Sequence, residues 1–152
     1  IRPELIHDPN VSKSISELIS LCDCFMPSES DLSYLYPAQD PNAVIRQLVK
    51  TSSKVVAYKK GAAGATIFAD GEEYNLDGHQ IHEVDPTGAG DCFCGTFTTL
   101  YYDGYSAELA GKYANAAGAL AASKLGPMEG NSTLGEIQHL LDSDKVQTRE
   151  CI

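Results

Sequence analysis

The sequence has no long apolar run and is poor in basic residues. No stretch approaches the roughly 18 apolar residues that a membrane-spanning helix needs, which argues against a transmembrane protein. The 152 residues include 21 Asp and Glu against 11 Lys and Arg, so the formal net charge is −10. Such a surface repels the phosphates of nucleic acids and anionic lipids, and we expect neither as a partner. An anionic small substrate would need a local site of backbone N–H groups or a few basic side chains.

The opening stretch IRPELIHDPN has neither a basic nor an apolar segment, so we expect no signal peptide and a cytoplasmic protein. The five cysteines are an odd number, and four of them form two C-x-C pairs, Cys22 with Cys24 and Cys92 with Cys94. Structural zinc usually prefers the C-x2-C spacing, so buried, reduced thiols are favoured over a four-thiolate zinc site.

The length and a hydrophobic content of 43% fit one domain with a substantial core. Apolar spacing predicts helices at 13–22, 41–51, 89–103, 106–125 and 133–141, and a further helix capped by Ser28. Strands are predicted at 24–27, 54–58 and 78–84, with a hairpin at 65–76 that turns at Asp70-Gly71. Gly126 is expected to cap the 106–125 helix, whose many Ala and Gly residues indicate a close packing partner. This order favours an α/β fold with helices on a partly parallel sheet.

The chain begins with no strand ahead of its first helix. A helix-first α/β layer needs upstream strands to cover, and chain ends usually do not fall inside a connection. We therefore expect the chain to be the C-terminal part of a larger fold.

The stretch EVDPTGAGDCFCGTF, residues 83 to 97, carries the clearest chemical signal. Gly88, Ala89 and Gly90 allow a sharp turn into a helix whose first N–H groups have no internal partner. The helix dipole adds positive potential there, so the turn predicts an anion site.

Asp91 stands in the first turn of this helix, where a carboxylate would repel a bound phosphate. The residue makes chemical sense as a base that removes a proton from a hydroxyl attacking that phosphate. The alternative is structural: a tight strand-to-helix turn in which Asp91 only complements the dipole. Neither a Walker loop nor G-x-G-x-x-G is present, so spacing alone leaves both readings open.

Three other groups give weaker signals of a functional role. His79 and His82 are three residues apart, which in a strand places them on opposite faces and argues against a metal pair. Cys92 lies in a helix first turn, but burial is favoured over a nucleophilic role because no base is evident. Lys59 and Lys60 precede Gly61 and could contact nucleotide phosphates or simply form a solvated strand end.

VDPTGAGDCFCGTF resembles the D-x-T-G-A-G-D signature of the ribokinase-like (PfkB) carbohydrate kinases. MPSESDL, AYKKGAAGATIF and YANAAGALAASKLG resemble, in order, three further segments of that family, and IRPEL resembles the end of a segment found in 2-keto-3-deoxygluconate kinases. The resemblance implies a ribokinase-like three-layer α/β/α fold. It assigns residues 1–152 to the C-terminal nucleotide-binding half, without the N-terminal sugar-binding half and its lid.

The resemblance also implies roles in phosphoryl transfer. Asp91 matches the catalytic base, and Gly88, Ala89 and Gly90 match the anion hole around the transferred phosphate. Asp85 and Thr87, with the loop at 126–132, match positions that help to hold a monovalent cation such as K⁺.

Further positions match the nucleotide and metal sites of the family. The resemblance places Gly61 and Gly64, with Lys59, at the nucleotide, Asn115 near the adenine, and Arg2 near the phosphates or a substrate carboxylate. Ser28 and Asp31 stand where the family has Asn and Glu, which organise Mg²⁺ and its waters. Asp is one methylene shorter than Glu and Ser lacks the amide, although Glu29 could substitute in part.

The implied function is ATP-dependent phosphorylation of a sugar or sugar-acid hydroxyl. Arg2 favours a keto-deoxy sugar acid as the substrate. ATP and Mg²⁺ are the implied cofactors, and a homodimer is expected where the family's lid is present. One alternative is a nucleotide-binding module or fragment without catalysis. A purely structural α/β domain is a further alternative.

Overall fold

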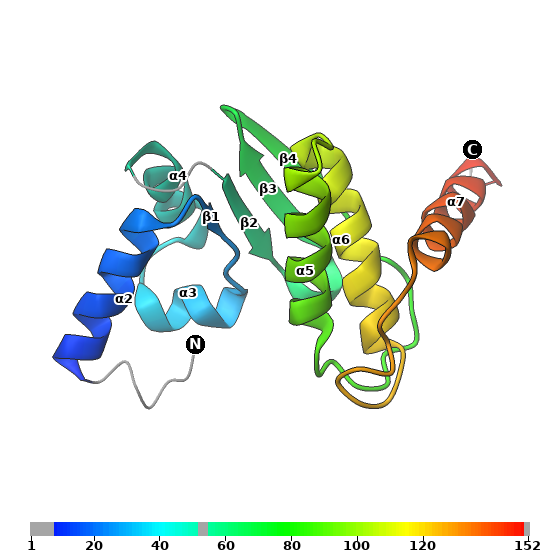
Figure 1. Cartoon of the computed structure of the whole chain (residues 1–152), viewed down its shortest axis with the longest axis horizontal. Coiled ribbons are helices and arrows are strands. Elements are labelled where there is room, and N and C mark those ends of the chain that lie inside the picture. Colours follow the sequence, from blue (N-terminus) through cyan, green and yellow to red (C-terminus); the bar gives the residue numbers. More distant parts are fainter. Residues whose placement is uncertain (1–7, 52–54, 151–152) are drawn as a thin grey trace. The chain divides into compact units, whose positions relative to one another are not determined.

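The computed structural model describes residues 8–51 and 55–150, which form two compact units (Figure 1). The first unit holds the described residues up to Gly61 together with Thr66–Asn75. The second holds Ala62–Ala65 and the chain from Leu76 onward. Each unit has its own packed elements and is described by itself.

The first unit contains helices α2 (Pro9–Leu21), α3 (Glu29–Leu35) and α4 (Pro41–Thr51). Helix α4 has the bounds that its apolar spacing predicts. Helix α2 begins four residues before the predicted start, because the Asp8 side chain accepts a hydrogen bond from Asn10 N at 2.8 Å and Pro9 suits the first helical position.

The sheet of the first unit has the order β1-β2-β3-β4, with β1 at Cys24–Phe25, β2 at Val55–Lys59, β3 at Ala65–Ala69 and β4 at Glu72–Leu76. Strands β1 and β2 are parallel, and the short 3-10 helix η1 (Gly61–Ala63) lies between β2 and β3. Strands β3 and β4 form the predicted hairpin, whose turn residues Asp70 and Gly71 have φ of 55° and 83°. The expected mixed α/β architecture is confirmed.

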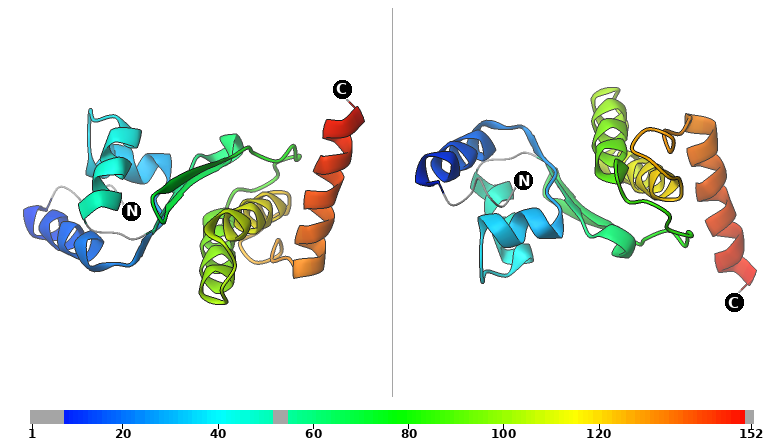
Figure 2. Two further views of the ribbon diagram at one scale, coloured as in Figure 1. Left: turned by 90° about the horizontal axis from the view of Figure 1, so that it is seen from above. Right: turned by 90° about the horizontal axis from the view of Figure 1, so that it is seen from below.

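Helices α3 and α4 pack against one face of this sheet and lie side by side in Figure 2. The core between them consists of buried side chains that follow the helical and strand periods: Leu32, Val44, Ile45, Val56, Tyr58 and Phe68. Ile45 and Val56 are fully buried, so this cluster is the main apolar anchor of the first unit.

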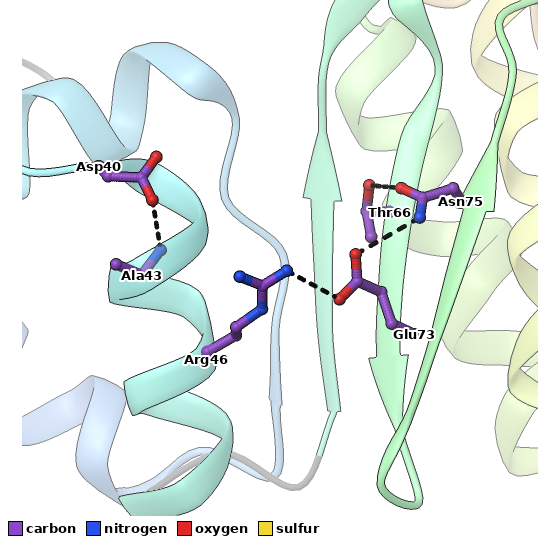
Figure 3. A network of polar contacts seen from close by, with 6 residues as sticks. All are labelled: Asp40, Ala43, Arg46, Thr66, Glu73 and Asn75. Carbon is purple, nitrogen blue, oxygen red and sulfur yellow. Dashed lines mark hydrogen bonds and ion pairs between the residues drawn. The ribbon is translucent and has the colours of Figure 1, made fainter.

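Polar contacts join α4 to the hairpin (Figure 3). Arg46 donates to Glu73 at 3.3 Å, and Asn75 donates to the other carboxylate oxygen of Glu73 at 3.4 Å. The buried Thr66 hydroxyl donates to Asn75 at 2.8 Å, which satisfies the one buried polar side chain of this strand pair.

The second unit contains α5 (Ala89–Tyr102), α6 (Ala107–Ala122) and α7 (Leu134–Glu150). Helices α5 and α6 lie side by side, as both views of Figure 2 show. Small buried residues such as Ala110, Ala114 and Ala121 let the two helices approach closely, as the Ala-rich sequence predicts. Helix α7 packs on α6 through a small apolar cluster centred on Ile137. Within the part of the chain that is described, no helix is long and apolar enough to cross a bilayer.

Three predictions about the second unit are wrong. Residues 78–84 form no strand, because Val84 N donates to the carbonyl of Ala122 at 2.9 Å instead of to a neighbouring strand. Helix α6 ends at Ala122 with Ser123 as its cap, so Gly126 is not its C-cap. Helix α7 continues nine residues past the predicted end at 141.

Replacement of Ile45 with Ala tests the core of the first unit. The side chain is 0% exposed, so the change leaves a cavity and should lower the unfolding free energy by about 2–5 kcal/mol. Leu18→Ala on α2 is the control, since Leu18 is 65% exposed and should change the free energy by less than about 0.5 kcal/mol. Urea unfolding measures both, and equal losses would contradict the assigned core.

Candidate functional site

The turn at 85–91 leads directly into α5. Gly88 is the N-cap with φ of 83°, a left-handed conformation that favours glycine, and no side chain caps the helix. The N–H groups of Gly90 and Asp91 stand in the first helical turn, where no intrahelical acceptor is available. The turn therefore presents uncapped amides and the positive end of the α5 dipole to whatever binds there.

The Asp85 carboxylate joins this turn to the loop after α6. One oxygen accepts from Thr87 N and the other from Gly126 N, both at 3.0 Å. The N–H of Asp85 donates to Ala122 O at 3.1 Å, so the main chain adds a second link. We call this arrangement the Asp85 bridge. The hydrogen bonds from Thr87, and then that from Gly126, lower the pKa of Asp85 below its ordinary value of 3.8.

Close backbone contacts make the bridge tight. A Cβ on Gly88 would lie 2.4 Å from the carbonyl oxygen of Pro127, and one on Gly130 would lie 2.4 Å from the Cα of Ala121. A Cβ on Gly118 of α6 would lie 3.2 Å from Ala89 O. The glycines therefore let α5, α6 and the 126–132 loop meet around one turn.

Asp91 is exposed at the third residue of α5, so its carboxylate and the uncapped amides share one helix end. The neighbouring Cys92 thiol donates to the Asn131 side chain at 3.2 Å. Burial, and then the charge of Asp91, raises the pKa of Cys92. A raised pKa disfavours the thiolate, which supports the packing role expected for Cys92 over a nucleophilic one.

A second group of predicted residues also lies in the second unit. Gly64 has φ of 91°, and a Cβ there would lie 2.1 Å from Leu76 O. The Asn115 side chain donates to the Asp77 carbonyl at 2.8 Å. The predicted nucleotide-side residues Gly64 and Asn115 thus contact one short segment, residues 76–78. Gly61, which belongs to the first unit, has φ of 56° and open space around the position of a Cβ.

The first unit holds Ser28, Asp31 and Lys59 at the carboxyl ends of β1 and β2. Lys59 N donates to Pro27 O at 2.9 Å, and Ser28 and Lys59 form a parallel bridge. One Asp31 oxygen accepts from the N–H and the hydroxyl of Ser28, at 2.8 and 2.7 Å, and so completes a capping box on α3. Arg2 lies outside the described residues.

The structure adds Gly118 and Asp77, which sequence reasoning missed, and singles out Pro127 and Asn131 within the 126–132 loop that was expected at this turn. Pro127, Gly118 and Asn131 close around the turn, and Asp77 links Asn115 to the Gly64 turn. Their signals were weak, because a glycine in an Ala-rich helix and a Gly-Pro pair in a loop are common. Only spatial proximity distinguishes them.

Neither of the two predicted cation sites has a complete set of side-chain ligands among the described residues. Within 8–51 and 55–150, no three His, Cys, Asp or Glu side chains gather in a way that could hold a metal ion. Mg²⁺ commonly binds through one or two carboxylates plus substrate phosphates, and the Asp31 carboxylate, which is bonded to Ser28, is a single donor of that type. Asp85, like other carboxyls of ordinary or lowered pKa, is ionised at neutral pH, which suits a neighbouring monovalent cation.

The family comparison covers most of the chain. A model described as pfkB family carbohydrate kinase matches residues 1–134. A 2-dehydro-3-deoxygluconokinase of Thermoproteus tenax is 32% identical over 143 residues, which are 93% of this chain and 44% of the relative. The chain therefore spans less than half the length of this curated relative.

Solved structures agree with the expected fold. A protein from E. coli described as ribokinase II, in complex with ATP and Mg²⁺, has a TM-score of 0.88 and 37% identity, covering 94% of this chain and 46% of that one. A fructokinase double mutant from Vibrio cholerae O395, bound to fructose, ADP and potassium, has a TM-score of 0.79 and 25% identity, covering 93% of this chain and 48% of that one. The ribokinase-like α/β fold expected from the sequence is confirmed.

A pair of glycine variants tests the turn. Gly88→Ala introduces a Cβ at positive φ and against Pro127 O, and should cost about 2 kcal/mol or more of unfolding free energy. Gly95→Ala, in the same helix with nothing within 4 Å of its Cβ, should stabilise the protein by about 0.5–1 kcal/mol. Chemical denaturation compares them, and two changes of the same sign would refute the close approach.

The Asp85 bridge predicts a direction of pH dependence. Because the folded-state pKa lies below 3.8, the stabilisation by this carboxylate is fully present above that value. The contribution is lost as the pH falls through the folded-state pKa. The stability difference between the wild type and Asp85→Asn should therefore shrink over that acidic range. NMR titration of the carboxyl carbon gives a direct check, and a midpoint at or above 3.8 would contradict the bridge.

Proposed function

This chain belongs to the pfkB family of carbohydrate kinases, and from this premise we propose that the complete protein transfers the γ-phosphate of ATP to a hydroxyl of a sugar or sugar acid. The observation that carries the proposal is the turn at 85–91. It places uncapped amides and the Asp91 carboxylate at one end of α5. Binding alone would not require that carboxylate, whereas proton removal from an attacking hydroxyl does.

We propose that residues 1–152 form the C-terminal, nucleotide-binding part of a ribokinase-like domain. Two relatives support this, because each is covered to less than half of its length by nearly all of this chain. The sugar-binding part and the lid would then lie in the remaining portion of the complete protein.

In the proposed reaction, the substrate hydroxyl oxygen attacks the γ-phosphorus and the bond to the bridging β,γ-oxygen breaks. The hydroxyl proton passes to the Asp91 carboxylate, and ADP leaves with the electrons of the broken bond. The turn of Gly88, Ala89 and Gly90 would border the charge that develops on the transferred group, with the N–H groups of Gly90 and Asp91 as donors, since Ala89 N donates to Pro86 O. The Asp85 bridge keeps these amides in place before the nucleotide arrives, so little reorganisation accompanies the reaction.

Cations complete the proposed site. Mg²⁺ bound with ATP would neutralise phosphate charge, and Asp31 with Glu29 would hold its water shell. Because Asp31 also caps α3, its position is fixed relative to that helix. Asp85 and Thr87, with the loop after Gly126, would border a monovalent cation. The potassium ion named for the Vibrio fructokinase agrees with a monovalent cation as a ligand.

The nucleotide is proposed to lie along the Gly61 and Gly64 turn, with Lys59 and Arg2 toward the phosphates. Asn115 would lie near the adenine, with its side chain bonded to the Asp77 carbonyl. The complex of the E. coli relative with ATP and Mg²⁺ supports ATP as the nucleotide.

We propose a keto-deoxy sugar acid as the substrate class. The name of the Thermoproteus relative, a 2-dehydro-3-deoxygluconokinase, agrees with this choice. A carboxylate on the sugar would pair with Arg2, which the resemblance places near the substrate.

One observation favours a second candidate, a nucleotide-binding module without catalysis. Asp31 is engaged by Ser28, and both residues differ from the family's Asn and Glu. Calorimetry with MgATP followed by a coupled assay over a panel of sugars and sugar acids separates the two. Binding without transfer by the complete protein would favour the second candidate.

Asp91→Asn tests the proposed base. The variant loses proton acceptance while it keeps size and shape, so kcat should fall by about 10²- to 10⁴-fold or more. MgATP affinity should change little, because the amides remain. Asp103→Asn at the opposite end of α5 is the matched control and should keep normal turnover. Near-normal turnover of Asp91→Asn with nucleotide bound would refute the assignment.

A further inference from the structure

Residues 76–79 form a short connection that three other parts of the second unit hold in place. On one side lies the Gly64 turn: a Cβ on Gly64 would lie 2.1 Å from Leu76 O, and one on Gly78 would lie 1.9 Å from Ala62 O. On another side, Asn115 of α6 donates to the Asp77 carbonyl at 2.8 Å. No side chain fits between these backbones, so a shift of the connection must shift the Gly64 turn as well.

The third contact comes from α7. His79 Nδ1 lies 2.5 Å from an oxygen of Asp144, and the His79 side chain is 9% exposed. The green segment around residues 77–84 reaches α7 in both views of Figure 2. A polar ring that is more than nine-tenths buried needs a partner, and Asp144 supplies one. Asp144 itself is 37% exposed, so the carboxylate lies at the edge of the contact.

Apolar and polar contacts hold helix α7 against α6. Ile137 is 2% exposed and packs with Ala116 and Ala117 of α6, while the Tyr113 hydroxyl donates to Gln138. These contacts set the position of α7 against the same helix that carries Asn115. The family match ends at residue 134, so Asp144 lies beyond the part that the family description covers.

We propose that Asp144 and His79 are positioning residues that fix the 76–79 connection, and through it the Gly64 turn and the Asn115 side chain, for nucleotide binding. This inference rests on the proposed nucleotide site. Asp144 holds the His79 ring, and the ring anchors a backbone that contacts both nucleotide-side residues. Neither residue is proposed to contact the nucleotide. Their effect falls on nucleotide affinity and leaves the phosphoryl-transfer step unchanged.

A merely structural role makes a different prediction. If the pair only fastens α7, its loss lowers stability and leaves nucleotide affinity as it was. A positioning role changes the affinity for MgATP at a temperature where the variant is fully folded. The sugar KM and the kcat at saturating nucleotide should stay within about twofold, because the 85–91 turn is not part of the connection.

The experiment uses the complete protein and the variants Asp144→Ala, Asp144→Asn and Ser143→Ala. Ser143 is the control on the same helix, exposed and bonded to the His139 carbonyl. Hydrogen exchange without nucleotide reports on the amides of 76–79, and calorimetry with MgATP reports on affinity. Asp144→Ala should speed exchange there and raise the Kd about fivefold to tenfold. Asp144→Asn keeps size and an acceptor oxygen, so it should lie between Ala and wild type even if the Ala variant folds poorly.

The outcomes distinguish failure of this inference from failure of the proposed function. Faster exchange with weaker MgATP binding in the Asp144 variants, and neither change in Ser143→Ala, supports the inference. Unchanged exchange at 76–79, or faster exchange with unchanged affinity, overturns it and leaves the proposed function standing. A wild-type protein that does not bind MgATP overturns the proposed function, and the inference falls with it.

Discussion

The Asp85 carboxylate, which accepts N–H groups from Thr87 and Gly126, is the contact on which the candidate site depends. It joins residues 41 positions apart and brings the start of α5 against the loop after α6. A charged acceptor is stronger than a neutral one, and the lowered pKa shows that the folded state favours the ionised form. The same charge makes the bridge compatible with a cation beside a site for anions.

Around the Asp85 bridge, glycines allow the main chains to approach closely because they have no side chain. Gly88 adopts a left-handed conformation and lies against Pro127 O, and Gly118 lets α6 approach Ala89. Ala89 N donates to Pro86 O at 3.2 Å, and among the described residues no side chain caps the N–H groups of Gly90 and Asp91. An uncapped helix end costs stability unless water or a ligand satisfies it, so the turn is prepared for an anion. Asp91 then adds a proton acceptor at the place where phosphoryl transfer needs one.

The sequence predicted elements whose local signals agree with their surroundings. Helix α4 has its predicted bounds because Val44 and Ile45 lie on one apolar stripe, and the hairpin turns at Asp70-Gly71 because those residues suit positive φ. The strand predicted at 78–84 fails because Val84 bonds to Ala122 and His79 to Asp144, contacts that strand periodicity cannot reveal. In the site, the Gly-rich turn and Asp91 were visible as a motif. The roles of Asn131, Gly118 and Asp144 could be recognised only from their contacts in the structure. The sequence therefore predicted the candidate reacting groups but not the residues that hold them in place.

In the proposed function, the amides at the start of α5 bind the phosphate that Asp91 helps to transfer. The most direct measurement is the backbone amide NMR spectrum of the protein with and without MgATP. We expect the largest shift changes at the amides from Gly88 to Asp91, with smaller changes at Gly64 and Asn115. MgATP binding that leaves the amides of Gly88 to Asp91 unmoved would contradict it.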